Sequence, residues 1–111
     1  MSVYQFKVAG VTFEGRQTLI ARAAGVAKVG RVFPYLCPEP NDPYDPDAIG
    51  VYLYIQNFEG GWDWTHIGYV PRSMTWGVRQ HLYRMKWIGV EFPYHTNFGA
   101  KITYEVDDAA R

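Results

Sequence analysis

Four prolines fall within one short segment of this chain, residues 37–47. They are Pro38, Pro40, Pro43 and Pro46. Proline fixes its own φ angle and has no amide proton to donate, so this segment excludes a helix and a central strand. Each proline also restricts the residue that precedes it. We therefore expect an irregular loop with a stiff, defined backbone, and we call it the proline loop.

Alternating apolar residues on both sides of the proline loop indicate β-strands. The clearest strand is residues 48–55, in which four aliphatic side chains at odd positions would share one face and two tyrosines the other. Residues 56–63, with two adjacent glycines, predict a hairpin connection to a returning strand. The other expected strands are residues 3–9, 28–36, 64–70, 87–90 and 100–106. Pro34 favours an edge position for the strand at 28–36.

Two segments have helical character. Residues 16–24 predict a short helix that Gly25 would end. Pro71 suits the start of a second helix over residues 72–86. Its packing stripe would consist of Met74, Val78, Leu82 and Met85. Several strands with one or two packing helices predict a mainly β fold, a small OB-like antiparallel β-barrel that forms one domain over residues 1–106. Residues 107–111 are expected to be a C-terminal tail.

The composition bounds the class of protein. Hydrophobic residues make up 48% of the chain, which is enough for a core without a metal or disulfide staple. One cysteine cannot form an internal disulfide, so a cytoplasmic location is the expectation. No apolar stretch approaches the roughly 18 residues of a membrane helix. The 11 basic and 11 acidic residues balance, which argues against a large phosphate-coating surface and leaves a small local site open.

No motif for catalysis is present. The sequence lacks a nucleophile elbow, a phosphate loop and a dinucleotide fingerprint. Cys37 lies among prolines with no base beside it, so we interpret it as a half-buried structural thiol. The three histidines do not have metal-ligand spacing, and the acidic proline loop lacks the calcium-binding pattern. We expect no enzyme activity, no cofactor and no metal site.

Tyr44 and Asp45, between two prolines, form the most informative pair. A tyrosine ring offers a stacking surface for a base or sugar. A carboxylate only accepts hydrogen bonds, so it suits a hydroxyl or amine donor and repels phosphate. The alternative is that Asp45 caps a turn while Tyr44 fills the core. The residues alone leave these two interpretations open.

Other residues could complete a binding site. Phe13 and Arg16 combine a ring with a guanidinium that could hold a phosphate, although a core phenylalanine and a solvated arginine are the more ordinary interpretation. Arg72 follows Pro71 at a helix start, where anions are favoured. The aromatic segment 92–98 could form a further wall. The four tryptophans, Trp62, Trp64, Trp76 and Trp87, are interpreted as core or its rim.

Three segments together resemble the HIRAN domain. They are VAGVTFEGRQ at residues 8–17, PEPNDPYDPDAIGVY at residues 38–52 and IGYVPR at residues 67–72. The middle segment is the most specific, and the resemblance extends over roughly residues 4–106. It implies an OB-like β-barrel that captures the 3′ end of single-stranded DNA, in members that occur alone in bacteria and phages or fused to DNA-remodelling ATPases of replication-fork repair.

The resemblance also implies roles for particular residues. Tyr44 corresponds to the stacking tyrosine of the end pocket, and Asp45 to the aspartate that accepts the hydrogen bond of the terminal 3′-hydroxyl. Phe13 and Phe98 correspond to further aromatic residues of the pocket. Where eukaryotic members have a phosphate-holding arginine this chain has Thr12, so Arg16 or Arg72 would take that part. Asp42 stands where an uncharged residue is common.

The expected partner is therefore a single-stranded DNA 3′ end, with a separate ATPase or helicase as a protein partner. A rival hypothesis is a protein-interaction module whose tyrosine- and tryptophan-rich surface binds a partner or a second copy, giving a homodimer. A second rival is a nuclease, which would need a carboxylate cluster that the sequence does not offer outside the proline loop.

Overall fold

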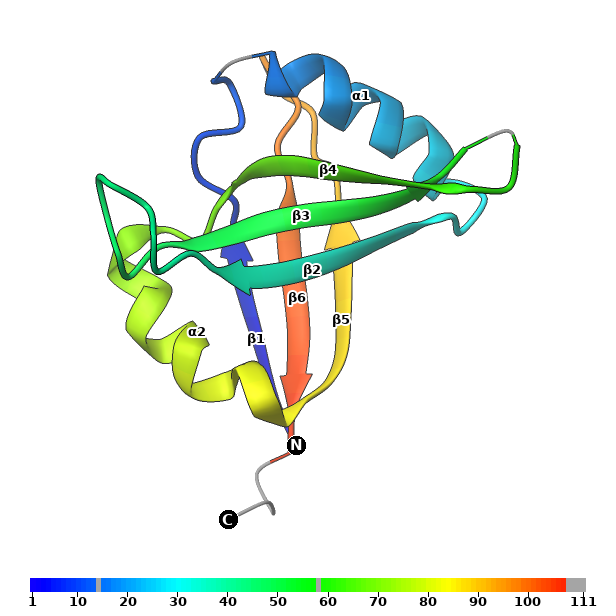
Figure 1. Cartoon of the computed structure of the whole chain (residues 1–111). Helices are drawn as coiled ribbons and strands as arrows, with labels where there is room; N and C mark the ends of the chain where they lie inside the picture. The colour runs from blue at the N-terminus through cyan, green and yellow to red at the C-terminus, as the bar shows by residue number, and fades with distance from the viewer. Residues whose placement is uncertain (14, 58, 108–111) are drawn as a thin grey trace.

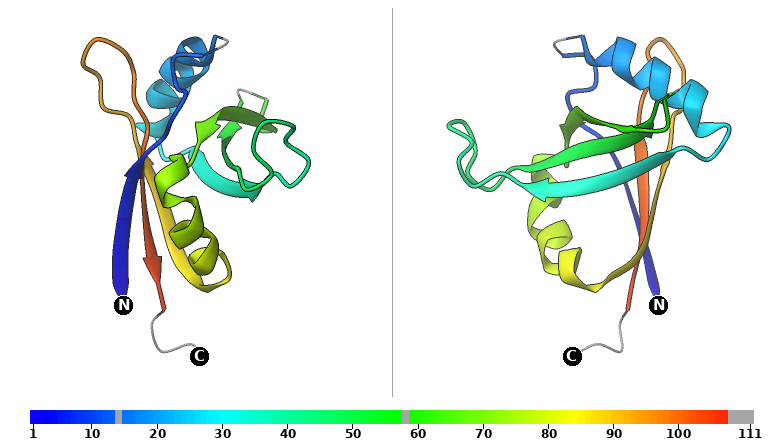
Figure 2. Two further views of the ribbon diagram at one scale, coloured as in Figure 1. Left: turned by 90° about the vertical axis from the view of Figure 1, so that its left-hand side faces the viewer. Right: turned by 45° about the vertical axis from the view of Figure 1, so that its right-hand side comes forward.

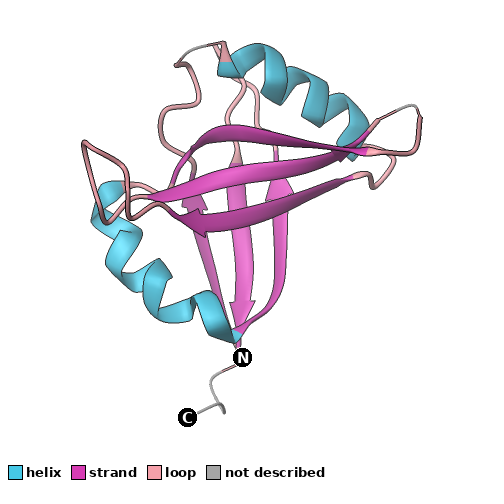
Figure 3. Cartoon of the chain, in the orientation of Figure 1, coloured by secondary structure: helices cyan, strands magenta, loops and turns pink. Residues whose placement is uncertain are grey.

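Two antiparallel sheets of three strands each form the molecule, and they cross steeply (Figures 1 and 3). The structure is a computed structural model that describes residues 1–13, 15–57 and 59–107. One sheet has the order β1–β6–β5 and the other the order β2–β3–β4. The strands are β1 (Ser2–Lys7), β2 (Val32–Pro38), β3 (Ile49–Gln56), β4 (Trp62–Tyr69), β5 (Met85–Glu91) and β6 (Lys101–Val106). Every strand predicted from the sequence is present, with shifted ends.

The predicted faces of β3 are confirmed. Its four aliphatic residues are almost completely buried, whereas Tyr52 and Tyr54 lie on the opposite, outer face. Pro34 lies in β2, which is an edge strand as predicted, so its missing amide proton breaks no ladder inside the sheet. The core between the sheets also takes side chains from the other sheet and from both helices, among them Ile20, Val78, Ile102, Tyr104 and Val106.

Two helices flank the β2–β3–β4 sheet. Helix α1 (Arg16–Ala27) lies beyond β4, and α2 (Thr75–His81) lies beyond the β2 edge (Figures 1 and 2). The prediction that Gly25 ends the first helix is wrong. A Cβ at Gly25 would meet nothing within 4 Å, so the position is open. Burial of Ile20 and Ala23 outweighs the modest propensity penalty of an exposed glycine, and the helix continues to Ala27.

The second predicted helix, residues 72–86, is broken into three short pieces. Single 3-10 turns, η1 (Arg72–Met74) and η2 (Leu82–Arg84), precede and follow α2. Met85 already belongs to β5. Val78 is buried, and the other three residues of the predicted stripe pack against the core from partly buried positions. The stripe is therefore confirmed. The prediction of one regular helix is wrong, because the α-helical part covers only Thr75–His81 and the last two predicted residues belong to β5.

One short bridge connects the two sheets. Beyond the end of β1, Ala9 and Tyr69 exchange both of their backbone hydrogen bonds, at 2.8 and 2.9 Å. A Cβ at Gly68 would clash with the carbonyl oxygen of Ala9, so glycine is needed where these backbones meet. Within the described residues no continuous ladder closes the two sheets on each other. The mainly β fold is confirmed, and the closed barrel stays a prediction.

The predicted C-terminal tail is only partly visible, because residues 108–111 lie outside the described residues. Asp107 itself is held: its amide donates to the Arg84 carbonyl at 3.1 Å, and its carboxylate lies 3.5 Å from the Lys86 ammonium. Across the described ranges, no helix combines the length and apolar character that crossing a membrane requires.

A buried tyrosine should make the fold sensitive to alkaline pH. Burial raises the pKa of Tyr104 to about 12 from 10.0, and its hydroxyl lies 2.9 Å from Nδ1 of His81. The neutral form is favoured in the folded state, so stability is complete below pH 10 and falls as pH rises toward 12. Between pH 8 and pH 11 we expect this residue alone to lower the free energy of unfolding by about 1.4 kcal/mol.

Tyr104→Phe is the matching test, by urea unfolding at both pH values. At pH 8 the variant should be less stable than the wild type by about 1 kcal/mol, because the hydrogen bond is lost. At pH 11 that gap should close, since phenylalanine does not ionise. A gap that is the same at both pH values would contradict the prediction.

Candidate nucleic-acid interface

A cleft of about 590 Å³ opens where the proline loop, the first loop (residues 10–13) and η1 meet. Five of the six residues predicted to bind DNA line it. They are Phe13, Arg16, Tyr44, Asp45 and Arg72. These residues come from three segments that are far apart in the sequence, and the bridge between Ala9 and Tyr69 brings the first segment against the end of β4. The fold therefore gathers most of the predicted site in one concave surface.

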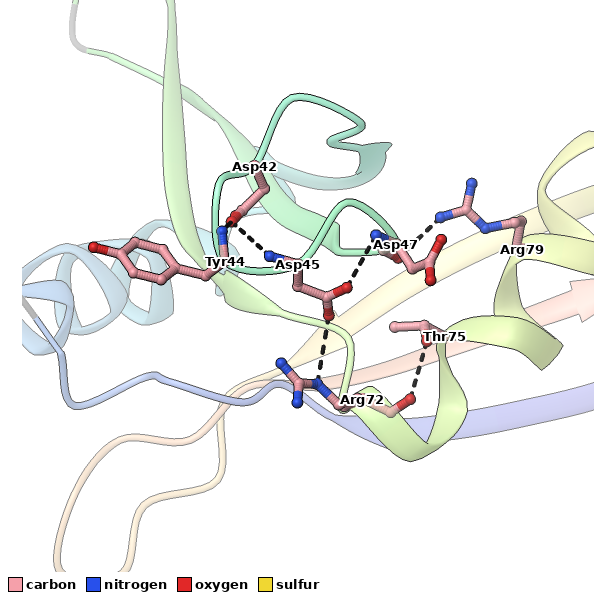
Figure 4. Close-up of polar contacts among 7 residues, drawn as sticks. All are labelled: Asp42, Tyr44, Asp45, Asp47, Arg72, Thr75 and Arg79. Carbon is pink, nitrogen blue, oxygen red and sulfur yellow. Dashed lines mark hydrogen bonds and ion pairs between the residues drawn. The ribbon is translucent and has the colours of Figure 1, made fainter.

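Side-chain oxygens fix the backbone of the proline loop (Figure 4). Oδ1 of Asp42 accepts hydrogen bonds from the amides of Tyr44 and Asp45, at 2.8 and 3.1 Å. Oδ1 of Asp45 accepts from the amide of Asp47 at 2.9 Å. Such aspartate turns supply acceptors for backbone amides of an irregular loop. Asp45 thus caps a turn, as one interpretation predicted, but Tyr44 does not fill the core, because 92% of it is exposed.

Side chains of α2 and η1 contact the proline loop. The Arg79 guanidinium donates to the Asp47 carbonyl at 2.9 Å, and Oγ1 of Thr75 donates to the Arg72 carbonyl at 3.0 Å. Nε of Arg72 lies 3.5 Å from Oδ2 of Asp45. This ion pair is loose, and 81% of the Arg72 side chain is exposed, so its terminal nitrogens remain available to a ligand. Asp45 keeps spare acceptor capacity on both carboxylate oxygens.

Phe13 in the first loop and Arg16 at the start of α1 both differ from the ordinary expectation. Phe13 is 59% exposed rather than in the core, and Arg16 is 9% exposed rather than solvated. Arg16 donates to the Gly10 carbonyl at 2.8 Å. Its guanidinium carbon lies 5.8 Å from the centre of the Phe13 ring and 5.5 Å from that of Tyr69. Cation–π contacts therefore hold the charge between two rings at the wall of the cleft.

Tyr69 is a lining residue that the sequence analysis missed. It contacts Arg16, and burial, followed by the nearby carboxylates of Glu39 and Asp42, raises the pKa of its hydroxyl. It therefore presents a neutral hydroxyl near pH 7. The sequence feature that could have indicated Tyr69 is its position directly after Gly68, the glycine that allows the close approach of Ala9. With Asp42 also in the wall, two arginines face two aspartates in the cleft.

Phe98 is not brought together with the other predicted residues. Its amide donates to Oε1 of Gln17 and its carbonyl accepts from Nε2 of Gln17, both at 2.8 Å. Its ring lies 4.8 Å from that of Tyr94, and it lines a different hollow beside the end of α1. The backbone of Phe98 is therefore bound to Gln17 near the start of α1, and Phe98 does not line the cleft.

Two further interpretations have clear outcomes. The four tryptophans are all exposed, from 44% for Trp64 to 76% for Trp76, so none lies in the core and that part of the interpretation is wrong. Cys37 is partly buried and lies 3.6 Å from the Pro38 carbonyl oxygen, as expected of a structural thiol. In the described part of the chain, no three histidine, cysteine or acidic side chains gather as a metal ion would require.

No family model, curated protein or solved structure matches this chain. The class of site must therefore be judged from the cleft itself. Its walls combine two exposed aromatic rings, a hydrogen-bond-accepting carboxylate on a braced loop, and two guanidinium groups, one buried and one exposed at the rim. That set suits a ligand with a planar ring, a hydroxyl donor and a single nearby anion.

Proposed function

We propose that this protein binds the 3′-hydroxyl end of single-stranded DNA and has no catalytic activity of its own. The observation that carries the proposal is the convergence of Phe13, Tyr44, Asp45 and Arg72 on one cleft. A nucleotide end offers what these residues complement: bases that stack, a hydroxyl that donates and a phosphate that accepts.

Each residue has a distinct part in this proposal. Tyr44 and Phe13, whose rings are largely exposed, stack on the terminal bases. Asp45 accepts the hydrogen bond of the 3′-hydroxyl through the spare acceptor capacity of its carboxylate. Arg72 releases its loose ion pair and holds the nearest phosphate. Arg16 is too buried to move toward a ligand, so its positive charge attracts the phosphate from a fixed position.

The same proposal includes the HIRAN resemblance of residues 4–106, whose stacking tyrosine and hydroxyl-reading aspartate correspond to Tyr44 and Asp45. It includes an OB-like barrel, in which the bridge from Ala9 to Tyr69 is the start of the closure between the two sheets. It also includes a separate ATPase or helicase that the module would guide to DNA ends during repair or fork processing.

The test compares ends of one fluorescent oligothymidylate in a binding titration. The 3′-hydroxyl form should bind at least about tenfold more tightly than the 3′-phosphate form. A 3′-phosphate has no hydroxyl to donate at the sugar, and it places added negative charge beside Asp42 and Asp45. A phosphate on the 5′ end is the control, and it should leave the affinity unchanged. Equal affinities for the two 3′ ends would exclude the proposal.

A further inference from the structure

The outward side of the β2–β3–β4 sheet is covered by aromatic rings. Phe33, Tyr35, Tyr54, Trp62 and Trp64 are each between 40% and 53% exposed, and we call them the aromatic face. They alternate along their strands with the buried side chains of the core, so the pleat of the sheet places all of them on one side. In the views of Figures 1 and 2, no described helix or strand lies over that side.

The aromatic face is continuous with the cleft. Tyr69, in the wall of the cleft, meets the ring of His66 edge to face, with centroids 4.8 Å apart. His66 stacks on Tyr52 at 4.6 Å, and Tyr52 stacks on Trp64 at 4.7 Å. Trp64 in turn contacts the rings of Tyr54 on β3 and Tyr35 on β2. An unbroken path of ring contacts therefore leads from the candidate site across the sheet.

Positive side chains stand at both ends of this path. Arg16 lines the cleft and also a second hollow that it shares with Trp64 and His66, so a positive group stands where the two surfaces join. At the far end, Arg31 is exposed directly before β2, and Arg22 is paired with Asp63 at 2.7 Å. Glu39, a carboxylate at the near end of the sheet, accepts the hydrogen bond of the Tyr52 hydroxyl.

The chemistry of the face fits unpaired bases. Besides the rings, the outward positions of these strands carry Cys37, Gly50 and Gln56, so no aliphatic side chain interrupts the stacking surface. Stacking on such rings tolerates any base, because every base has a π-face. From His66 to Trp62 the path runs about 13 Å along β4, which is room for a few bases beyond those held in the cleft.

We propose that the aromatic face is a second binding surface for single-stranded DNA, which takes the bases that precede the end held in the cleft. This inference rests on the proposed function for the identity of that end. A second copy of the chain or another protein on the same face is the competing occupant, and the experiment below separates the two.

The test measures how affinity depends on strand length. Wild-type protein should bind a 3′-hydroxyl dodecathymidylate at least about tenfold more tightly than a trithymidylate, since stacking on rings adds to the end contact. Trp64→Ala should remove about tenfold of the affinity for the long strand and leave the short strand unaffected. Trp64→Phe, which keeps a ring, should retain most of the gain. Circular dichroism would establish that each variant is folded.

Trp76→Ala is the matched control, because Trp76 is a still more exposed tryptophan outside the aromatic face. It should behave as wild type with both strands. If both strand lengths bind equally well, the second surface is excluded while end capture stands. If neither strand binds, both proposals fail. If Trp64→Ala abolishes a dimer in size-exclusion chromatography without changing DNA affinity, the face binds a second copy and the inference is overturned.

Discussion

Gly68→Ala is expected to lower the free energy of unfolding by about 3 kcal/mol. Gly68 has a φ of 156°, which side chains rarely adopt, and an added Cβ would meet the Ala9 carbonyl oxygen and lie 2.6 Å from the Val8 side chain. Both obstacles belong to the segment directly after β1, where Ala9 forms the bridge to Tyr69. Relief of the clash would separate the strands that join the two sheets, and urea unfolding would measure the loss.

Gly25→Ala is the matched control for that substitution. It adds the same methyl group inside α1, where nothing lies within 4 Å and the φ angle is ordinary. Alanine stabilises an exposed helical position relative to glycine by about 0.5–1 kcal/mol, so this variant should be more stable than the wild type. Opposite signs for the two substitutions are the expected pattern. A Gly68→Ala variant as stable as the wild type would mean that the bridge contributes little to the fold.

The strands were predictable because burial on one face leaves a period of two in the sequence. In β3 that pattern is complete, and the faces it predicts are those observed. The helix over residues 72–86 was predictable only in part. Its apolar spacing continues to Met85, but Met85 pairs with Val106 in the sheet, and this tertiary contact decides the end of the helix.

The exposed aromatic residues could not be predicted from residue type. Tryptophan is buried on average, and that average suggested core positions. The alternation along β4 carried the correct information, because Trp62 and Trp64 alternate with the buried Thr65 and Ile67. Two of the four tryptophans therefore lie outward for the same reason as the tyrosines of β3.

Some features of the candidate site could be predicted from the local sequence, whereas others depend on contacts between distant segments. The stiffness of the proline loop and the turn that Asp45 caps follow from local chemistry, which the sequence contains. The burial of Arg16 depends on Tyr69, which lies more than fifty positions later and reaches the first loop only through the bridge at Ala9. Long-range contacts of this kind have no local signature. The same holds for Phe98, whose backbone is bound by Gln17.

Replacing Asp45 by asparagine should weaken binding of a 3′-hydroxyl strand by at least about tenfold, the value of a hydrogen bond to a charged acceptor. Asparagine retains an oxygen that can accept from the Asp47 amide, so the turn of the proline loop is kept. It replaces the second oxygen, which faces Arg72, with a donor. Simple charge repulsion predicts the opposite sign, because the variant is less negative next to a polyanion.

Two comparisons make this prediction decisive. Asp47→Asn removes the same charge two positions away, where only the backbone is engaged, and it should leave binding unchanged or slightly tighter. A strand that ends in a 3′-deoxy sugar lacks the donor, so wild-type protein should bind it about tenfold more weakly, whereas Asp45→Asn should bind both ends alike. Because the hydroxyl and the carboxylate would then be coupled in one thermodynamic cycle, the result locates the end-reading contact at Asp45. A wild-type protein indifferent to the missing hydroxyl would leave Asp45 as a turn cap alone.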